Sequence, residues 1–305
     1  MGKFFKKLTA TCLAGVLLTA GILTPVQPAQ AAAKAWEKKN GKYYNSAGAA
    51  VPGVVAKGMD VSVWQGLIDW NKVKASGQIE FAFVRVAHGS GMDLYRDRNL
   101  SEANRVGIPV GVYFYSTAQT TAQAKKDAAT TINAIKKYEI TYPVVIDIED
   151  NSQLSLTTTR RTKIVQTFAD EVRAAGYQPM IYCNTNWAKQ YINMSGLQGV
   201  DAWIAEWSAN YTKSIPRDVW QVSDKGSVSG ISGDVDLDFA FKQYGSGSTT
   251  AQEVWEKTSE GYQYKLSSGK YVKDQFKTID GKVYYFMLHL LRVPGFLGFR
   301  IAVQL

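Results

Sequence analysis

Between about residues 57 and 244, short apolar and β-branched runs alternate with longer polar stretches, a pattern that predicts strands separated by loops and helices. The expected strands cover residues 58–61, 81–87, 109–116, 142–149, 179–184, 201–207, 219–223 and 235–241. Helices are clearest at 121–137 and at 158–175, where Gly176 marks the stop. Eight strands at this spacing predict an α/β fold, an irregular TIM-like (β/α) barrel whose later strands leave little room for helices.

The fourth predicted strand ends in Asp147-Ile148-Glu149. Side chains two positions apart on a strand share a face, so the two carboxylates are expected to lie together. In a partly dry site, such a pair is expected to have one raised and one low pKa. This difference suits cleavage of a glycosidic bond, which needs a protonated acid and an ionised partner. A surface pair at a strand end would give the same short pattern.

Further acids favour the catalytic interpretation. Asp60 lies near the end of the first predicted strand, and Asp236 lies in the last one. In a parallel barrel the strand ends converge on one rim, where active sites form. We therefore expect Glu149, Asp147, Asp60 and Asp236 to meet there. For Asp238, capping of a turn is the alternative role.

Aromatic residues near the strand ends are candidates for sugar contacts. Tyr113, Tyr182 and Trp220 could each offer a flat apolar face to a ligand ring. Packing in the core is the competing interpretation for each of them.

The start of the chain resembles a secretory signal. Three lysines within the first seven residues precede an apolar stretch at 13–23, and Ala29-Gln30-Ala31 offers small residues for cleavage. We expect residues 1–31 to be a signal peptide and the mature protein to be secreted, with a membrane anchor as the alternative. The net charge of +9 permits nucleic acid as a partner, but an exported chain is expected to meet an anionic cell envelope instead.

Other catalytic classes find little support. The only histidines, His88 and His289, are too far apart in the sequence to favour a zinc site or a Ser-His-Asp triad. There is no G-x-G-x-x-G or G-K-[ST] phosphate-binding motif, so neither a metal nor a cofactor is expected. Cys183 is interpreted as a buried, unreactive thiol.

The flanks of the barrel share aromatic residues and Gly turns typical of small stacked hairpins. Trp36-Glu37-Lys38 precedes the barrel, and Trp255-Glu256-Lys257 follows it. The segment 287–305 is apolar and lacks this aromatic and Gly-turn pattern. It is interpreted either as a membrane-active tail or as the product of a reading-frame change. The expected organisation is a signal peptide at 1–31, a partial wall-binding-like repeat at 32–56, the catalytic barrel at 57–244, a linker and wall-binding-like repeats at 245–286, and an atypical apolar tail at 287–305.

A family resemblance rests on motifs that occur in order within the barrel region. They are Asp60-Val61-Ser62, Trp64-Gln65-Gly66, Phe81-Ala82-Phe83-Val84-Arg85, Gly111-Val112-Tyr113, the run from Pro143 to Glu149, Trp220-Gln221 and Val235-Asp236-Leu237. This set resembles glycoside hydrolase family 25, the peptidoglycan lysozymes of bacteria and their phages. The resemblance implies an irregular β/α barrel that cuts the β-1,4 bond between N-acetylmuramic acid and N-acetylglucosamine.

The resemblance also implies roles for individual residues. Glu149 matches the general acid and Asp147 the carboxylate that assists it, while Asp60 and Asp236 complete the cleft. Gln65 and Arg85 belong to the matched motifs and are expected to contact substrate together with the three aromatics. We favour a mechanism in which an ionised Asp147 orients the substrate's acetamido group, over one with a protein nucleophile.

Two positions depart from the family pattern. Phe114 stands where many members have His, and Asp238 stands where many have Asn. Either departure is expected to change subsite contacts without removing a catalytic acid.

The flanks resemble the wall-binding repeats of choline-binding proteins. The expected partners are therefore bacterial peptidoglycan and, through the repeats, anionic or choline-bearing wall polymers, with the protein acting as a monomer and without nucleic acid. A non-catalytic wall-binding protein, or a glycosidase acting on chitin, remains the alternative.

Overall fold

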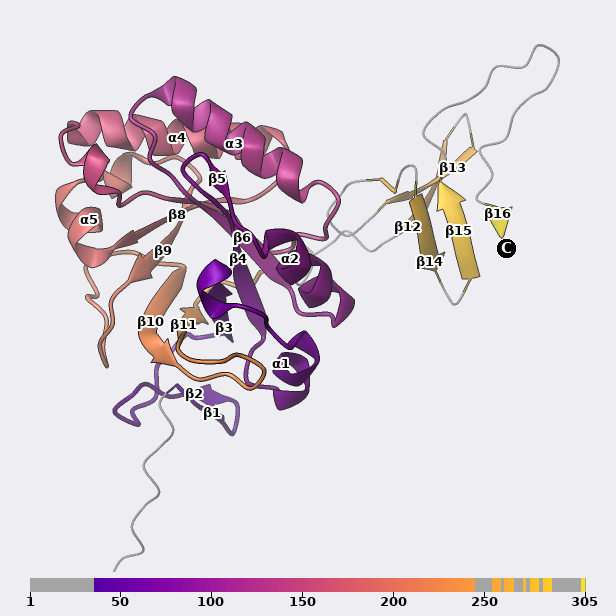
Figure 1. The fold of residues 1–305 in the computed structure, drawn as a ribbon, viewed down its shortest axis with the longest axis horizontal. Helices are drawn as coiled ribbons and strands as arrows, with labels where there is room; N and C mark the ends of the chain where they lie inside the picture. The colour runs from indigo at the N-terminus through magenta and orange to yellow at the C-terminus, as the bar shows by residue number, and fades with distance from the viewer. Residues whose placement is uncertain are drawn as a thin grey trace, which may run out of the picture. The chain divides into compact units, whose positions relative to one another are not determined.

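The central feature of the computed structural model is a closed barrel of eight strands (Figure 1). The structure describes residues 36–244, 254–258, 261–265, 271–272, 275–279, 282–286 and 303–304. The barrel strands are β3 (Ala56–Val61), β4 (Phe81–His88), β6 (Val110–Tyr115), β7 (Val144–Asp147), β8 (Pro179–Asn184), β9 (Asp201–Ala205), β10 (Val219–Gly226) and β11 (Val235–Ala240). All eight predicted strands are confirmed. The predicted signal peptide, the linker at 245–250 and residues 287–302 of the predicted tail lie outside the described residues.

The barrel closes because β3 pairs with β4 on one side and with β11 on the other. From β3 through β10 the neighbouring strands run parallel, but β11 is antiparallel to both β10 and β3. The last strand thus departs from the parallel arrangement on which the expected convergence of strand ends rested. This reversal matters for the site, because the start of β11 meets the end of β3 at one rim of the barrel.

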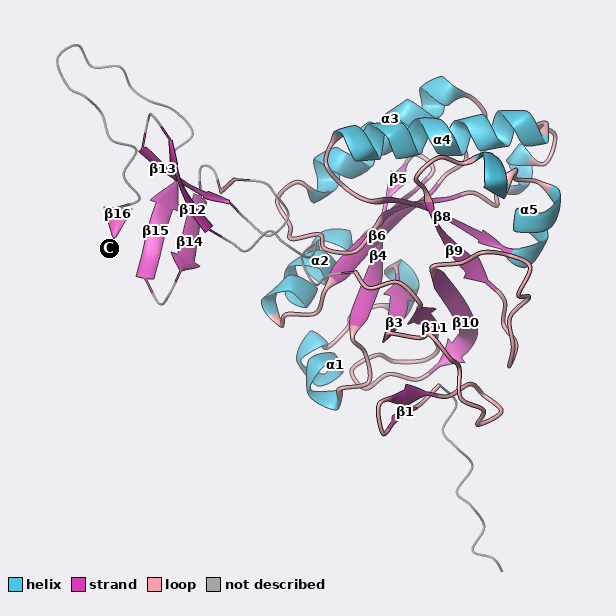
Figure 2. Ribbon diagram, turned by 180° about the vertical axis from the view of Figure 1, so that it is seen from behind, coloured by secondary structure: helices cyan, strands magenta, loops and turns pink. Residues whose placement is uncertain are grey.

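Helices cover the outside of the barrel, and Figure 2 shows α3 and α4 lying side by side over one flank. The helices are α1 (Trp70–Ser76), α2 (Arg96–Arg105), α3 (Thr121–Ile135), α4 (Thr158–Ala174) and α5 (Thr185–Gln190). The two predicted helices, α3 and α4, are confirmed. Thr120 and Gln123 form a capping box at the start of α3, and Gly176 adopts φ +83° just beyond α4. In the described chain no helix separates β9, β10 and β11, which confirms the expected irregularity on that side.

Strand alternation divides the core into an inner and an outer part. Phe81, Phe83 and Trp203 point into the barrel, where the Phe83 ring stacks on the Trp203 ring at a centroid distance of 4.5 Å. Gly58 and Gly111 make room for these rings, because a Cβ atom at either position would lie 2.4 Å from a phenyl carbon. The barrel is thus filled below its mouth, so a ligand must bind at the rim.

The outer core includes the hairpin that precedes the barrel, formed by β1 (Lys38–Lys39) and β2 (Lys42–Tyr43). Trp36 and Tyr43 are each only 4% exposed. The Trp36 ring packs edge-on against Trp220 at 5.7 Å and Phe239 at 5.6 Å. The interpretation of this segment as a wall-binding repeat is therefore wrong, because its aromatic faces are buried against the barrel.

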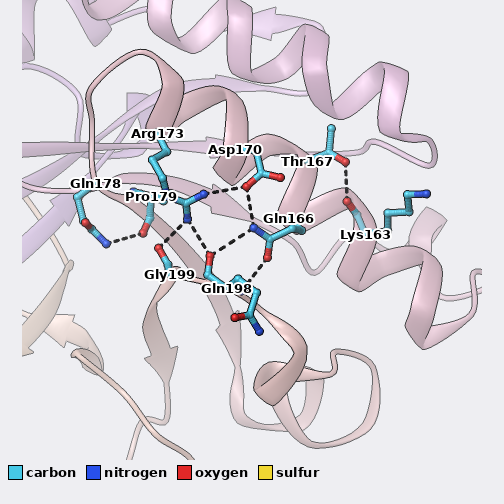
Figure 3. A network of polar contacts seen from close by, with 9 residues as sticks. All are labelled: Lys163, Gln166, Thr167, Asp170, Arg173, Gln178, Pro179, Gln198 and Gly199. Atoms are coloured by element: carbon cyan, nitrogen blue, oxygen red, sulfur yellow. Dashed lines mark hydrogen bonds and ion pairs between the residues drawn. The ribbon is translucent and has the colours of Figure 1, made fainter.

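A polar network ties the loop before β9 to α4 (Figure 3). The Arg173 guanidinium donates to the carbonyls of Gln198, at 2.8 Å, and Gly199, at 2.9 Å. The Gln198 backbone N–H donates to the Gln166 side chain at 2.8 Å. These bonds fix the loop from which β9 enters the barrel.

Beyond the barrel, β12 (Val254–Thr258) pairs with β13 (Gly261–Lys265), and β14 (Gln275–Ile279) pairs with β15 (Lys282–Phe286). A further strand, β16 (Val303–Gln304), pairs with β15. The Trp255 ring contacts Tyr264 and Tyr284, each at 5.1 Å. Among the described residues, no helix is long and apolar enough to cross a membrane.

Candidate active site

Asp147 ends β7 on the same face as the inward-pointing Val145, and Glu149 follows it closely enough for its charge to act on Asp147. Asp147 is 4% exposed, and its Oδ1 has no hydrogen-bond partner among the described residues. Glu149 accepts hydrogen bonds from the Asn184 side-chain amide at 2.8 Å and from the Asn184 backbone N–H at 3.2 Å. One carboxyl is therefore anchored, while the other keeps a buried acceptor free.

Both carboxyls have pKa values above the ordinary range. Burial raises the pKa of Asp147 strongly, the charge of Glu149 adds to this effect, and Arg85 opposes it. Burial also raises the pKa of Glu149, against the two bonds from Asn184. The expected split into one high and one low pKa is wrong for the free protein, because both groups are desolvated.

A second group of carboxyls lies where β3 meets β11. Asp60 and Asp236 are direct partners across the antiparallel ladder, and Asp238 is the next inward position on β11. Burial is the main cause that raises the pKa of Asp60 well above normal and that of Asp236 to about 6. Asp238 does not cap a turn as one interpretation held. It is fully buried, and it accepts a hydrogen bond from the Trp203 indole at 2.8 Å.

Gln221 links the predicted site residues Asp60 and Tyr182 to Trp207, although the sequence did not single out Gln221 itself as functional. Its amide nitrogen donates to Asp60 Oδ2 at 2.7 Å, and its carbonyl accepts from the Tyr182 hydroxyl at 2.9 Å and the Trp207 indole at 3.0 Å. The Trp220-Gln221 motif contained the clue. Adjacent residues on a strand face opposite sides, so only one of the two can point into the barrel.

Trp220 is the residue that points outward. Its side chain is fully buried between the barrel wall and Trp36, and its indole donates to the Glu206 carbonyl at 2.8 Å. The prediction that Trp220 contacts substrate is wrong. The expectation that Phe114 alters a subsite is also wrong, since this side chain is 1% exposed within the outer core.

The other predicted contacts have mixed positions. Tyr113 and Tyr182 face inward at the mouth and are 9% and 8% exposed. Arg85 also faces inward, but its guanidinium forms an ion pair with Asp93 at 2.9 Å. The side-chain amide of Gln65 accepts a hydrogen bond from the Ser62 N–H at 2.9 Å and so caps a short 3₁₀ turn. Its side chain therefore stabilises this turn.

Neither a metal-binding cluster nor a reactive thiol is found among the described residues of this mouth. Within the described ranges, no group of three or more His, Cys, Asp or Glu residues is arranged to hold a metal ion. Cys183 is fully buried in the outer core, and burial raises the pKa of its thiol well above normal.

A closed β/α barrel with buried carboxyls gathered at one rim defines an acid–base barrel enzyme. Residues 59–231, more than half of the chain, match the family described as Glycosyl hydrolases family 25. The chain belongs to this family and is a glycoside hydrolase.

Similar proteins agree with this assignment. The chain is 30% identical over 187 residues to the "Autolytic lysozyme" of Clostridium acetobutylicum, covering 60% of this chain and 55% of that protein. It is 30% identical over 199 residues to "Lysozyme M1" of Streptomyces globisporus, covering 59% and 66%. The structure of the modular autolysin LytC from Streptococcus pneumoniae, in complex with a synthetic peptidoglycan ligand, has a TM-score of 0.59 and 27% identity, covering 67% of this chain and 52% of that one. The chain thus spans about half to two thirds of the length of these relatives.

Proposed function

We propose that the protein is a lysozyme that hydrolyses the β-1,4 bond between N-acetylmuramic acid and N-acetylglucosamine in peptidoglycan. The observation that carries the proposal is the inward-facing pair of Asp147 and Glu149 at the barrel mouth. The lysozyme names of two relatives and the peptidoglycan ligand of LytC support the choice of substrate.

Glu149 is proposed as the general acid. Burial raises the pKa of its carboxyl, which favours the protonated form needed before the reaction. The proton passes to the glycosidic oxygen as the bond to the anomeric carbon breaks. The two hydrogen bonds from Asn184 then stabilise the carboxylate that forms.

Asp147 is proposed to orient the acetamido group of the sugar whose anomeric bond is cut. An acetamido N–H would supply the hydrogen bond that Asp147 Oδ1 lacks. This bond favours the ionised form of Asp147, so substrate binding itself would separate the roles of two carboxyls that both have raised pKa values in the free protein. The acetamido oxygen attacks the anomeric carbon, and water then opens the ring intermediate with Glu149 acting as the base.

The remaining residues are proposed to bind the glycan. Asp60 and Asp236 lie opposite each other on β3 and β11, and the charge of Asp147 acts on Asp60. Both would bind sugar hydroxyls. Tyr113 and Tyr182 remain proposed contacts at the mouth. For Arg85 we propose an indirect contribution, since its charge lowers the pKa of Asp147 while Asp93 holds its guanidinium.

We further propose that the protein is secreted after removal of residues 1–31 and acts as a monomer. The hairpins after residue 244 are proposed to bind anionic or choline-bearing wall polymers. The aromatic contacts of Trp255 with Tyr264 and Tyr284 support an aromatic binding surface there.

Glu149→Gln tests the proposal, because the amide keeps the shape of the side chain but cannot donate the proton. We expect hydrolysis of purified peptidoglycan to fall by about 10²- to 10⁴-fold. The exposed Glu139→Gln is the matched control and should leave the rate unchanged. Mass spectrometry of the digest should show N-acetylmuramic acid at the new reducing end. A well-folded Glu149→Gln variant with the wild-type rate would refute the assignment, and preferential cleavage of chitin oligomers would refute the substrate.

A further inference from the structure

Gln221 connects the buried carboxyl of Asp60 to the exposed ring of Trp207. We propose that Gln221 is a positioning residue that holds Asp60 and the indole of Trp207 in one fixed arrangement, so that Trp207 forms a platform for a sugar ring of the bound glycan. This inference rests on the proposed function, because it assigns the platform to the same glycan substrate.

The orientation of the Gln221 amide follows from its neighbours. An indole N–H can only donate, so the atom 3.0 Å from Trp207 Nε1 must be the amide oxygen. The Tyr182 hydroxyl donates to the same oxygen at 2.9 Å. The amide nitrogen therefore faces Asp60 Oδ2, at 2.7 Å, and donates to it. Gln221 is 2% exposed, so this arrangement is shielded from solvent.

The bond from Gln221 also acts on the charge of Asp60. The Gln221 amide donates to Oδ2, and this bond lowers the pKa of Asp60, which favours its ionised form. Asp236 is the direct ladder partner, and its charge raises the pKa of Asp60. Gln221 thus stabilises the Asp60 carboxylate beside a second acid.

Trp207 has the geometry expected of a platform. It lies two residues after the end of β9 and is 59% exposed, although its indole nitrogen donates to the buried amide. A large aromatic face that is exposed at one side and fixed at its polar edge suits the apolar face of a pyranose ring. Through Gln221, a ring stacked there is held in register with Asp60.

Two substitutions at Gln221 separate the two bonds. Gln221→Met keeps the approximate length and removes both the donor and the acceptor. Gln221→Glu keeps oxygen acceptors for Tyr182 and Trp207 but loses the donor to Asp60. Trp207→Phe keeps a smaller aromatic face and loses the five-membered ring together with its N–H.

The first measurement is independent of activity. The indole N–H resonance of Trp207, assigned with Trp207→Phe in the full chain, should move in Gln221→Met and stay close to its wild-type position in Gln221→Glu. The indole of Trp64, which is 82% exposed, serves as the internal reference. An unchanged Trp207 resonance in a folded Gln221→Met variant would overturn the proposal.

The second measurement uses soluble peptidoglycan fragments. Loss of one hydrogen bond at a site that binds substrate corresponds to about a tenfold effect, so Trp207→Phe should raise KM by up to about tenfold with little change in kcat. Gln221→Glu should lower kcat, and Gln221→Met should change both. In the Gln221→Met background, Trp207→Phe should add little further to KM, whereas fully multiplicative effects would overturn the linkage.

The two proposals can fail separately. If the wild-type protein does not hydrolyse the fragments while the Trp207 resonance still responds to Gln221→Met, the positioning contact stands and the proposed function fails. If hydrolysis is confirmed and the substitutions act independently, only the positioning role of Gln221 is refuted.

Discussion

Replacing Trp36 with alanine should strongly destabilise the barrel, although residue 36 precedes the first barrel strand. The side chain is 4% exposed, and its ring lies edge-on to Trp220 and Phe239. A buried tryptophan removes about 150–250 Å² from water, and at about 25 cal/mol per Å² this amounts to roughly 4–6 kcal/mol. Large-to-small substitutions in cores cost about 3–5 kcal/mol, so we expect a loss in this range.

The assay is thermal and urea unfolding of the full mature chain, followed by circular dichroism. For a domain of this size, about 1 kcal/mol corresponds to about 2–4 °C, so Trp36→Ala should lower Tm by roughly 6–20 °C. Trp64→Ala is the matched control, because Trp64 is 82% exposed and its loss should change stability by less than about 0.5 kcal/mol. Equal melting temperatures for the two variants would refute the inclusion of the hairpin in the core.

Three further predictions concern the site and the flanks. Asp147→Asn should lower the hydrolysis rate on N-acetylated fragments, and de-N-acetylated fragments should lose little more, whereas an equal proportional loss on both would contradict substrate assistance. Burial and the charge of Asp224 raise the pKa of Asp236 from 3.8 to about 6, so its contribution to stability is present below pH 3.8 and is lost as pH rises through about 6. This shift corresponds to on the order of 3 kcal/mol, so Asp236→Asn should gain stability relative to wild type between pH 4 and 7 in urea titrations, and a constant difference would contradict the shift. A chain ending at Tyr244 should cleave soluble fragments at the wild-type rate. In a pull-down it should bind intact walls up to about tenfold less tightly, because the hairpins no longer add a multivalent contact. Undiminished binding would contradict a wall-binding role for the hairpins.

Much of the barrel could be predicted because period and burial are local properties of the sequence. The run that ends in Asp147-Ile148-Glu149 gave both the strand and the shared face of its two carboxyls, and the structure places both side chains at the mouth. The direction of the last strand, in contrast, could not be predicted from local sequence. Its reversal depends on pairing between β3 and β11, which lie far apart in the sequence.

Two errors have a common physical cause. Trp220 was predicted to contact sugar because it lies near a strand end. Successive side chains on a strand point to opposite faces, however, and here Gln221 rather than Trp220 points into the barrel. Likewise, the aromatic residues of 36–44 resembled those of the later hairpins, yet Trp36 and Tyr43 are buried against the barrel wall. Local patterns do not show which surface is available to cover an aromatic ring.

The pairing of β3 with β11 has a consequence for the order in which the molecule can fold. The first barrel strand, β3, can pair on both sides only after the last strand, β11, has been made. The contact of Trp36 with Phe239 also forms only then, because Phe239 lies on β11. During synthesis from the amino end, β3 and its neighbours form an open sheet with unpaired edges until β11 emerges. Because long-range pairing carries an entropic cost before its contacts form, we expect ring closure to be a slow step of folding. The interval before it is when the chain is most exposed to pairing with other copies of itself.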